Sequence, residues 1–223
     1  MKKVNVLAFA AITLFLTACG GKTETTTTEE QQAAEKQGEV YAVNLETSKV
    51  DWKAFHKGGF APRWGTLALK SGELSVENGD ITAGDFVVDM QSLKVDPASV
   101  TEKDKKYTDL EGHLKNADFF DVEKNPNADF VITKVSNLEA PVANAVEGAN
   151  KTISGNLKLK GSTLNVSFPA KVTVADGAVT IQAKFTVDRS AWGIKFGTTE
   201  ADPAEWMISK DIELGIDVKA AKK

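Results

Sequence analysis

Apolar and polar residues alternate along most of the chain from Val40 onward, as in β-strands with one buried and one solvated face. The clearest run has an apolar residue at every second position: Ile212, Leu214, Ile216 and Val218. Asn78-Gly79 and Asp176-Gly177 separate other such runs, and both dipeptides are strong signals of two-residue hairpin turns. Many strands joined by hairpins predict an all-β domain, either a closed antiparallel barrel or a sandwich.

A single stretch between residues 102 and 117 has helical spacing. Its apolar residues fall three or four positions apart, at Tyr107, Leu110, Leu114 and Ala117. Thr101 is placed to cap this helix, and Asn125-Pro126 marks a later stop. We therefore expect one short helix in a long connection, where it could cover one end of a barrel.

Two glycines indicate irregular points in the predicted strands. Gly84 predicts a β-bulge, after which Phe86, Val88 and Met90 point inward. Gly161-Ser162 predicts a turn between two further alternating runs.

The N-terminal region has the features of an export signal. Lys2 and Lys3 precede an apolar run at residues 4–16, which is too short for a spanning helix. The segment Leu16-Thr17-Ala18-Cys19-Gly20 resembles the bacterial lipobox, in which the cysteine is acylated and becomes the first mature residue. The alternative is an ordinary signal peptide with an incidental cysteine.

These features divide the chain into a signal peptide at residues 1–18, a lipidated Cys19 with a flexible polar tether up to residue 38, and one domain at residues 39–223. Residues 20–32 contain no large apolar side chain, so they cannot bury enough surface to offset the entropy of ordering. Gly20 in place of an aspartate favours the outer membrane over the inner one. The expected location is the cell envelope, with the membrane face left open.

The charge balance narrows the classes of partner. The formal charge is −4, and removal of residues 1–18, with two lysines and no acids, makes it −6. A mildly acidic chain argues against nucleic acid and against attachment to anionic head groups, so membrane attachment should come from the acyl chains on Cys19. A single cysteine also excludes an internal disulfide.

Four segments carry a resemblance to a known family. Residues 112–126 (GHLKNADFFDVEKNP) strongly resemble the signature of the YceI-like family. Three further motifs follow the family's order: residues 50–53 (VDWK), 155–161 (GNLKLKG) and 187–194 (VDRSAWGI). The resemblance implies a lipocalin-like antiparallel β-barrel with an apolar tunnel, in a periplasmic protein associated with a polyisoprenoid or another long-chain lipid.

The alternation of inward and outward residues along each strand then selects candidate site residues. Trp52 and His56 share the inward face of one predicted strand, and Arg189 continues the inward face of Phe185 and Val187. We predict that His56 and Arg189 hold a polar head group at the barrel mouth, since a guanidinium suits phosphate or carboxylate geometry. The predicted tunnel lining is Trp52, Phe86, Val88, Phe130, Ile132, Phe168, Phe185 and Val187.

Each of these residues also has a structural interpretation. Arg189 could pair with the neighbouring Asp188, and the aromatic residues could fill a solid core, as in many small barrels. A filled barrel would make the protein an interaction module with its function on the loops. His113 is expected to fix the helix to a strand by a hydrogen bond, and Phe119 with Phe120 to plug the barrel end. Trp64 is expected to close the mouth or to pack on its rim.

Motifs of catalysis are absent from the sequence. It has no Gly-x-Ser-x-Gly and no His-Glu-x-x-His, and its two histidines, His56 and His113, lack the spacing of a metal site. We therefore predict a non-enzymatic protein without cofactor or metal. The predicted partner is a long-chain isoprenoid, such as a quinone or its precursor, bound for transport, storage or sequestration. A role as a quinone-binding partner of a membrane oxidoreductase is a further alternative. The oligomeric state stays open, a dimer included.

Overall fold

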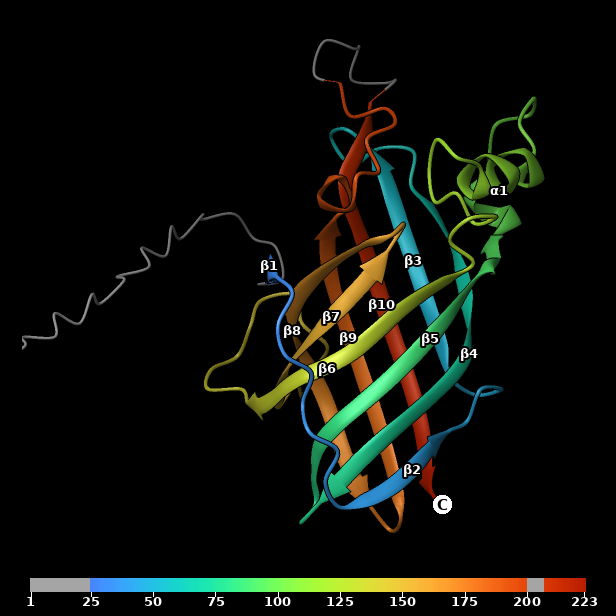
Figure 1. Cartoon of the computed structure of the whole chain (residues 1–223). Coiled ribbons are helices and arrows are strands. Elements are labelled where there is room, and N and C mark those ends of the chain that lie inside the picture. The colour runs from blue at the N-terminus through green and yellow to red at the C-terminus, as the bar shows by residue number, and fades with distance from the viewer. Residues whose placement is uncertain (1–24, 200–206) are drawn as a thin grey trace, which may run out of the picture.

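The computed structural model describes residues 25–199 and 207–223, so the predicted signal peptide and Cys19 lie outside the described residues. The described part is an antiparallel β-structure with one α-helix, α1 (Tyr107–Lys115), and two 3-10 turns, η1 (Pro97–Ser99) and η2 (Arg189–Trp192) (Figure 1). The strands are β1 (Thr26–Glu29), β2 (Glu39–Val43), β3 (Lys49–His56), β4 (Arg63–Glu77), β5 (Asp80–Val95), β6 (Asn127–Asn137), β7 (Lys151–Leu159), β8 (Ser162–Ala175), β9 (Ala178–Asp188) and β10 (Ile208–Lys222). No helix in these two ranges has the length and apolar character needed to cross a membrane.

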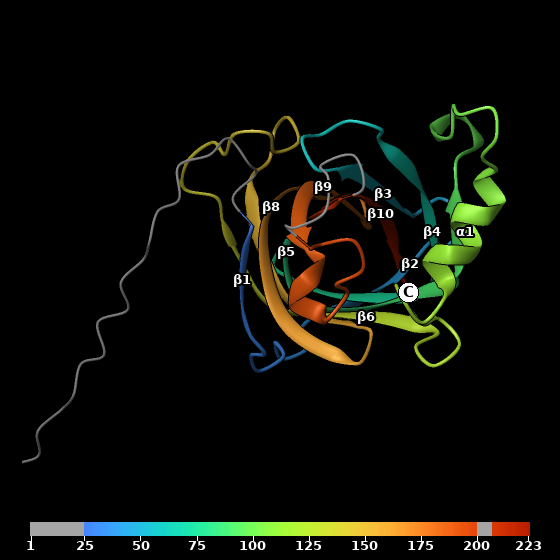
Figure 2. The same cartoon turned by 90° about the horizontal axis from the view of Figure 1, so that it is seen from above.

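The sheet closes on itself, which confirms the predicted barrel. Neighbouring strands pair antiparallel from β4 through β10, and β10 returns to β4 through β2 and β3. β2 and β3 lie end to end, because both pair with β4 on one side and with β10 on the other. The wall is therefore an eight-stranded barrel, and the view from above shows it closed around an interior (Figure 2).

Two-residue turns close three of the hairpins. Asn78 and Gly79 both have positive φ, at 51° and 84°, and Asp176-Gly177 repeats the pattern at 51° and 71°. Such turns match the twist of the strands, which is why Asn-Gly and Asp-Gly predicted them. The third turn is centred on Lys160-Gly161, one residue before the predicted position.

The predicted bulge is displaced by two residues. Gly84 pairs in register with Leu74, and the irregularity of the ladder falls at Thr82, between the partners of Ser75 and Val76. Gly84 serves a different purpose, because a Cβ there would lie 2.7 Å from Leu74 Cδ2 and 3.0 Å from Ile132 Cδ1. The residues after Gly84 face as predicted, with Phe86, Val88 and Met90 on the inner face of the barrel.

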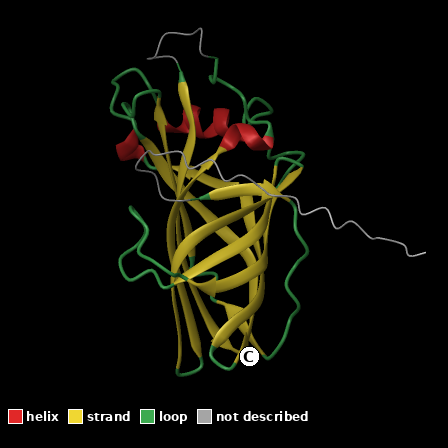
Figure 3. Ribbon diagram, turned by 90° about the vertical axis from the view of Figure 1, so that its left-hand side faces the viewer, coloured by secondary structure: helices red, strands yellow, loops and turns green. Residues whose placement is uncertain are grey.

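The helix begins later than its apolar spacing predicts. α1 starts at Tyr107, after Lys106 in the cap position with no side-chain cap bond, and not near Thr101. Glu102 instead bonds to Arg63 and Lys105, which holds the preceding residues in an irregular connection. Figure 3 shows the helix at the upper part of the barrel, and Figure 2 places it beside the wall next to β4 and not over the opening. The helix therefore does not cover the end as expected, although Leu110, His113 and Leu114 line the cavity from its side.

The part of the predicted tether that the structure describes is not free. Residues 25–38, here called the strap, lie against the outside of the barrel (Figure 1). β1 pairs with residues 164–167 of β8, on the edge that β9 leaves uncovered, since β9 pairs with β8 only from Ala170 onward. The paired strand satisfies an otherwise open edge.

The rest of the strap crosses the wall at points that can receive its backbone. Gln31 N and O bond to the Asn156 side chain on β7 at 3.0 and 2.6 Å, and Ala34 N donates to Ile132 O at 3.0 Å. Thr82 Oγ1 donates to Gln37 O at 2.7 Å. Two of these points adjoin ladder irregularities, at Thr82 in β5 and after Ile132 in β6, where a bulge frees backbone groups. The strap therefore differs from the flexible tether that its polar composition predicts.

Candidate functional site

The barrel interior holds a cavity of about 520 Å³, which is the candidate functional site. This volume is within the range of roughly 300–1,000 Å³ that small-molecule sites span. All eight predicted lining residues lie on its wall: Trp52, Phe86, Val88, Phe130, Ile132, Phe168, Phe185 and Val187. The interior is therefore hollow, which contradicts the alternative of a filled barrel.

An aromatic row crosses the cavity wall. Phe168 and Phe185 stack with ring centroids 3.9 Å apart, Phe130 lies 5.9 Å from Phe168, and Phe86 lies 6.3 Å from Phe130. β7 contributes Gly155 to this row, and a Cβ there would lie 2.2 Å from Phe130 Cζ. The missing side chain on β7 is what gives the Phe130 ring its place.

The cavity wall is polar at one end only. Aliphatic residues such as Ile181 and Val218, which pair with each other, line its far end, toward the hairpin turn at residues 176–177. The charged lining residues belong to the other end, here called the mouth, where α1 and the connection between β3 and β4 lie: Arg63, Asp104, Lys105, Lys106, Asp109 and Arg189. The arrangement suits an amphipathic ligand with its tail in the barrel and its head at the mouth.

His56 lies at the mouth as predicted and has an unused polar atom. Its Nδ1 is buried and has no hydrogen-bond partner among the described residues. Burial lowers the pKa of His56, and the charges of Arg63 and Lys105 lower it further, so the imidazole is neutral near pH 7. Its ring packs against the Phe60 ring, with centroids 5.5 Å apart. A buried neutral imidazole without a partner is available to hydrogen-bond a ligand.

Arg189 has a different role from the predicted one. Only 1% of the residue is exposed, and its guanidinium donates four hydrogen bonds to backbone carbonyls, of Ile194, Phe196, Ile208 and Ser209. Asp188 does not bond to it; its carboxylate caps η2 through Ser190. With these donors occupied, Arg189 holds the connection after η2 against the start of β10, and the predicted head-group role is wrong.

An aromatic cluster covers part of the mouth. The Phe119 ring lies 5.4 Å below the Arg189 guanidinium and 5.2 Å from the His113 ring, and Phe196 packs 4.8 Å from His113. Phe119 and Phe120 both line the cavity end, in agreement with the predicted plug. Among the described residues, His113 attaches the helix through these ring contacts and not through the predicted hydrogen bond to a strand.

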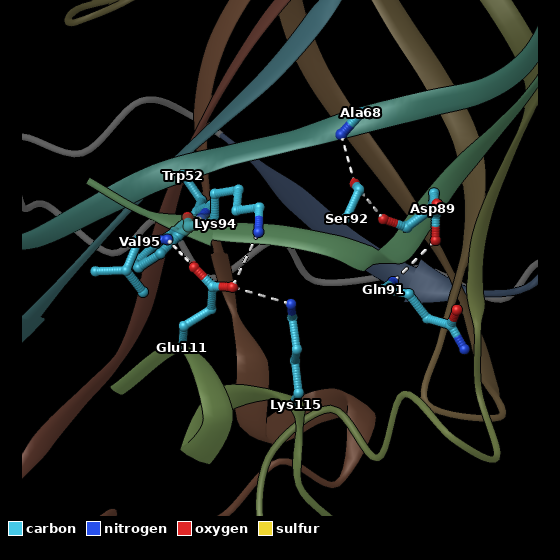
Figure 4. A network of polar contacts seen from close by, with 9 residues as sticks. All are labelled: Trp52, Ala68, Asp89, Gln91, Ser92, Lys94, Val95, Glu111 and Lys115. Carbon is cyan, nitrogen blue, oxygen red and sulfur yellow. Dashed lines mark hydrogen bonds and ion pairs between the residues drawn. The ribbon is translucent and has the colours of Figure 1, made fainter. Parts of the chain in front are cut away.

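A carboxylate fastens the helix to the barrel wall (Figure 4). Glu111 Oε2 accepts from the backbone N–H of Val95 at 3.2 Å, and Oε1 lies 3.3 Å from Lys94 Nζ and 3.1 Å from Lys115 Nζ. Although burial opposes ionisation, these donors keep the pKa of Glu111 below its usual value. Beside this network, Trp52 Nε1 donates to Lys94 O at 3.2 Å. The helix beside the mouth is thus fixed to the end of β5.

Other mouth residues were missed by sequence reasoning. Arg63 begins β4, and Lys105 and Lys106 lie in the connection before α1, whose path no periodicity fixes. Trp64 lines a groove on the outside of the wall, beside Tyr107, so it packs on the rim. In residues 25–199 and 207–223, no group of three or more His, Cys, Asp or Glu is placed to hold a metal ion.

Known structures share this fold. BcnA of Burkholderia cenocepacia matches with a TM-score of 0.57 at 18% identity, over 80% of this chain and 99% of that one. A polyisoprenoid binding domain from Saccharophagus degradans matches with a TM-score of 0.54 at 9% identity, over 82% and 98% of the two chains. At these identities the similarity is one of fold.

Sequence relatives and a family model assign the chain to a family. A UPF0312 protein of Pectobacterium atrosepticum is 29% identical over 151 residues, which are 63% of this chain and 70% of that protein. A UPF0312 protein of Pseudomonas putida is 31% identical over 121 residues, 54% of each. The family model of the YceI-like domain matches residues 41–220, which include β3 to β9 and all ten predicted ligand-site residues. The protein therefore belongs to the YceI-like family.

Proposed function

We propose that this protein binds one long-chain apolar ligand, a polyisoprenoid, inside the barrel. The observation that carries the proposal is the hollow interior, an apolar cavity of about 520 Å³ with charged residues at one end only. Burial of an apolar chain supplies the driving force, at about 0.8 kcal/mol for each methylene removed from water. The cost of association reduces this gain, so a chain of several isoprene units is needed for tight binding.

The class of ligand is supported by the lining and by one fold relative. Aromatic and branched aliphatic side chains form the wall, and they suit a branched, unsaturated hydrocarbon chain. The fold relative from Saccharophagus degradans is named a polyisoprenoid binding domain. Both observations support ligand binding, so the role we propose is that of a carrier or store.

The mouth favours an uncharged oxygen-bearing head group. Arg63 and Lys105 already share the carboxylate of Glu102, at 2.5 and 3.2 Å. Two buried polar atoms near the mouth lack a partner among the described residues, His56 Nδ1 and Glu102 Oε2. A quinone carbonyl or an alcohol of a quinone precursor would accept a hydrogen bond from this imidazole.

The cellular setting follows from the N-terminal sequence. A lipid on Cys19 would keep the barrel at an envelope membrane, where isoprenoids reside. Transport, storage and sequestration are all served by a single apolar cavity with one mouth. The prediction of anchoring is tested by Cys19→Ser: the variant is expected in the soluble envelope fraction and the unaltered chain in the detergent-soluble membrane fraction. Equal partition of both chains would contradict anchoring at Cys19.

The ligand itself is tested by native mass spectrometry of the mature chain, purified gently from bacterial membranes, with solvent extraction of any bound molecule. We expect one isoprenoid per chain. A clean apo mass, followed by no uptake of added quinone or polyprenyl phosphate, would contradict the proposal and favour an interaction module.

A further inference from the structure

Exposed aromatic side chains gather at the mouth. Among the described residues, four large apolar side chains are markedly exposed, and three of them lie at this end: Phe60, Tyr107 and Phe196, at 43%, 40% and 43%. The fourth, Leu45, lies in the loop that joins β2 to β3 partway along the wall, where Asn44 N donates to Lys219 O of β10. Isolated exposed apolar residues need no explanation, but three around the opening of an apolar cavity do.

Each ring is held outward by a separate element. Phe60 follows Gly58 and Gly59, both at positive φ, in the connection between β3 and β4. Tyr107 begins α1, whose position Glu111 fixes against β5. Phe196 rests on His113 and Phe119, and its carbonyl accepts from Arg189 Nη2 at 2.8 Å. The rings of Phe60 and Phe196 thus rest on other aromatic rings, and Tyr107 lies on the outer rim beside Trp64.

We propose that Phe60, Tyr107 and Phe196 form a docking surface for a lipid bilayer, which turns the mouth of the cavity toward the membrane. Aromatic rings are favoured at the level of the lipid head groups, and they enter without needing a complementary shape. A protein partner would require a continuous face of about 800 Å², whereas these rings come from three separate segments, two connections and the start of α1.

The charges around the rings fit a bilayer without a requirement for anionic lipid. Lys57, Lys106 and Lys195 are close in sequence to the three rings, and long lysine side chains reach head groups while their stems stay apolar. Asp104 and Asp109 lie at the same mouth and offset part of this charge. Docking should therefore depend on the aromatic side chains more than on salt.

The strap attaches the N-terminal end of the domain to the side of the barrel. β8 starts beside the mouth, since Lys160 Nζ bonds to Ala117 O after α1. Glu29 pairs with Leu164, whereas Thr26, the β1 residue nearest to Cys19 in sequence, pairs with Ser167, further from the mouth. Five residues lie between Cys19 and residue 25, and the fully extended segment from 19 to 25 spans at most about 20 Å. If Cys19 is acylated, as proposed above, the docked strap keeps the barrel close to the bilayer, and the exposed rings select the end that faces it. The docking surface also gives an isoprenoid a direct route between membrane and cavity. This route rests on the proposed function.

The test uses a fluorescent probe at matched positions. Cys19→Ser removes the sole cysteine and any lipid anchor, so Gly59→Cys or Gly79→Cys then places one thiol at either end of the barrel. Both glycines have φ of +84° and nothing within 4 Å of an added Cβ, so the two substitutions carry similar strain. Each mature chain from residue 19 is labelled with an environment-sensitive dye and titrated with phosphatidylcholine vesicles free of isoprenoid.

We expect a blue shift and a rise in emission at position 59 and none at position 79. Adding Phe196→Ser should weaken the apparent affinity about fivefold, because about half of a phenylalanine side chain no longer enters the interface. Leu45→Ser serves as the control and should leave the affinity unchanged. Thermal unfolding confirms that each variant is folded.

The remaining outcomes overturn the proposal. No response at position 59 up to millimolar lipid, or equal responses at both positions, excludes docking by the mouth. A shift that depends on protein concentration without vesicles assigns the surface to a second copy of the chain. Because the vesicles contain no isoprenoid, a failure of docking is distinguishable from a failure of ligand binding, which native mass spectrometry reports separately.

Discussion

The two ends of the barrel are closed in different ways. At the far end, two-residue turns at Asn78-Gly79 and Asp176-Gly177 join long ladders, and the end of β10 pairs with β2 and β9. The mouth has one tight turn, at Lys160-Gly161, beside long connections that carry a helix, exposed rings and an imidazole nitrogen without a partner among the described residues. The far end also has a long connection, at residues 138–150, but its two other hairpins are closed by local backbone geometry, whereas side chains hold the long connections of the mouth in place. Stability and ligand access are thus divided between the ends.

Among the substitutions that test this difference between the ends, we expect the largest effect from a change of Arg189 at the mouth. We expect Arg189→Gln to lower the free energy of unfolding by about 3–5 kcal/mol, because it leaves several buried carbonyls without donors. Urea unfolding measures the loss. Arg189→Lys should rescue little, since one ammonium cannot reach four carbonyls in the geometry of a guanidinium. A stably folded Arg189→Gln that fails only in ligand binding would restore the head-group role that the sequence first indicated.

A substitution on the outer wall tests whether the strap depends on Asn156 for its attachment. Asn156→Ala removes both bonds to Gln31 and one partner of Asn165, and we expect a loss of about 1–2 kcal/mol. Amide hydrogen exchange should quicken in residues 26–31 and stay unchanged in the hairpin at residues 78–79. Unchanged protection of residues 26–31 would show that the strap does not depend on this asparagine.

The smallest effect concerns the helix at the mouth. Because the pKa of Glu111 is lowered in the folded protein, its contacts stabilise the fold above the ordinary value of 4.5, and this contribution is lost as the pH falls below it. We expect Glu111→Gln to cost about 1 kcal/mol at pH 7, a fall in Tm of about 2–4 °C, and less at pH 3. An equal difference at both pH values would mean that the carboxylate charge is not involved.

The predictable part of the fold follows from local patterns. Alternation and Asn-Gly or Asp-Gly turns specify strands and hairpins, and parity then places Phe86, Phe130 and Phe185 on one wall. The helix start was missed because Glu102 forms a tertiary bond with Arg63, which sequence spacing does not contain.

The remaining errors have the same origin. The strap docks through backbone groups and an asparagine on β7, so its own composition gives no signal. Arg189 continues the inward parity of Val187, yet the chain turns into η2 at this residue and surrounds its guanidinium with carbonyls. Local pattern therefore predicts the wall, and only the folded connections decide which polar residues at the mouth stay free.

The most direct test of a hollow, ligand-binding barrel uses two adjacent valines of β5. Val88 lines the cavity, and Val87 alternates with it on the opposite face of the same strand. Native mass spectrometry of Val88→Trp and Val87→Trp, purified alike, compares the amount of bound isoprenoid. Val88→Trp should fill the cavity and reduce the bound fraction at least about tenfold, while Val87→Trp retains it; equal occupancy in the two folded variants would place the ligand outside the barrel.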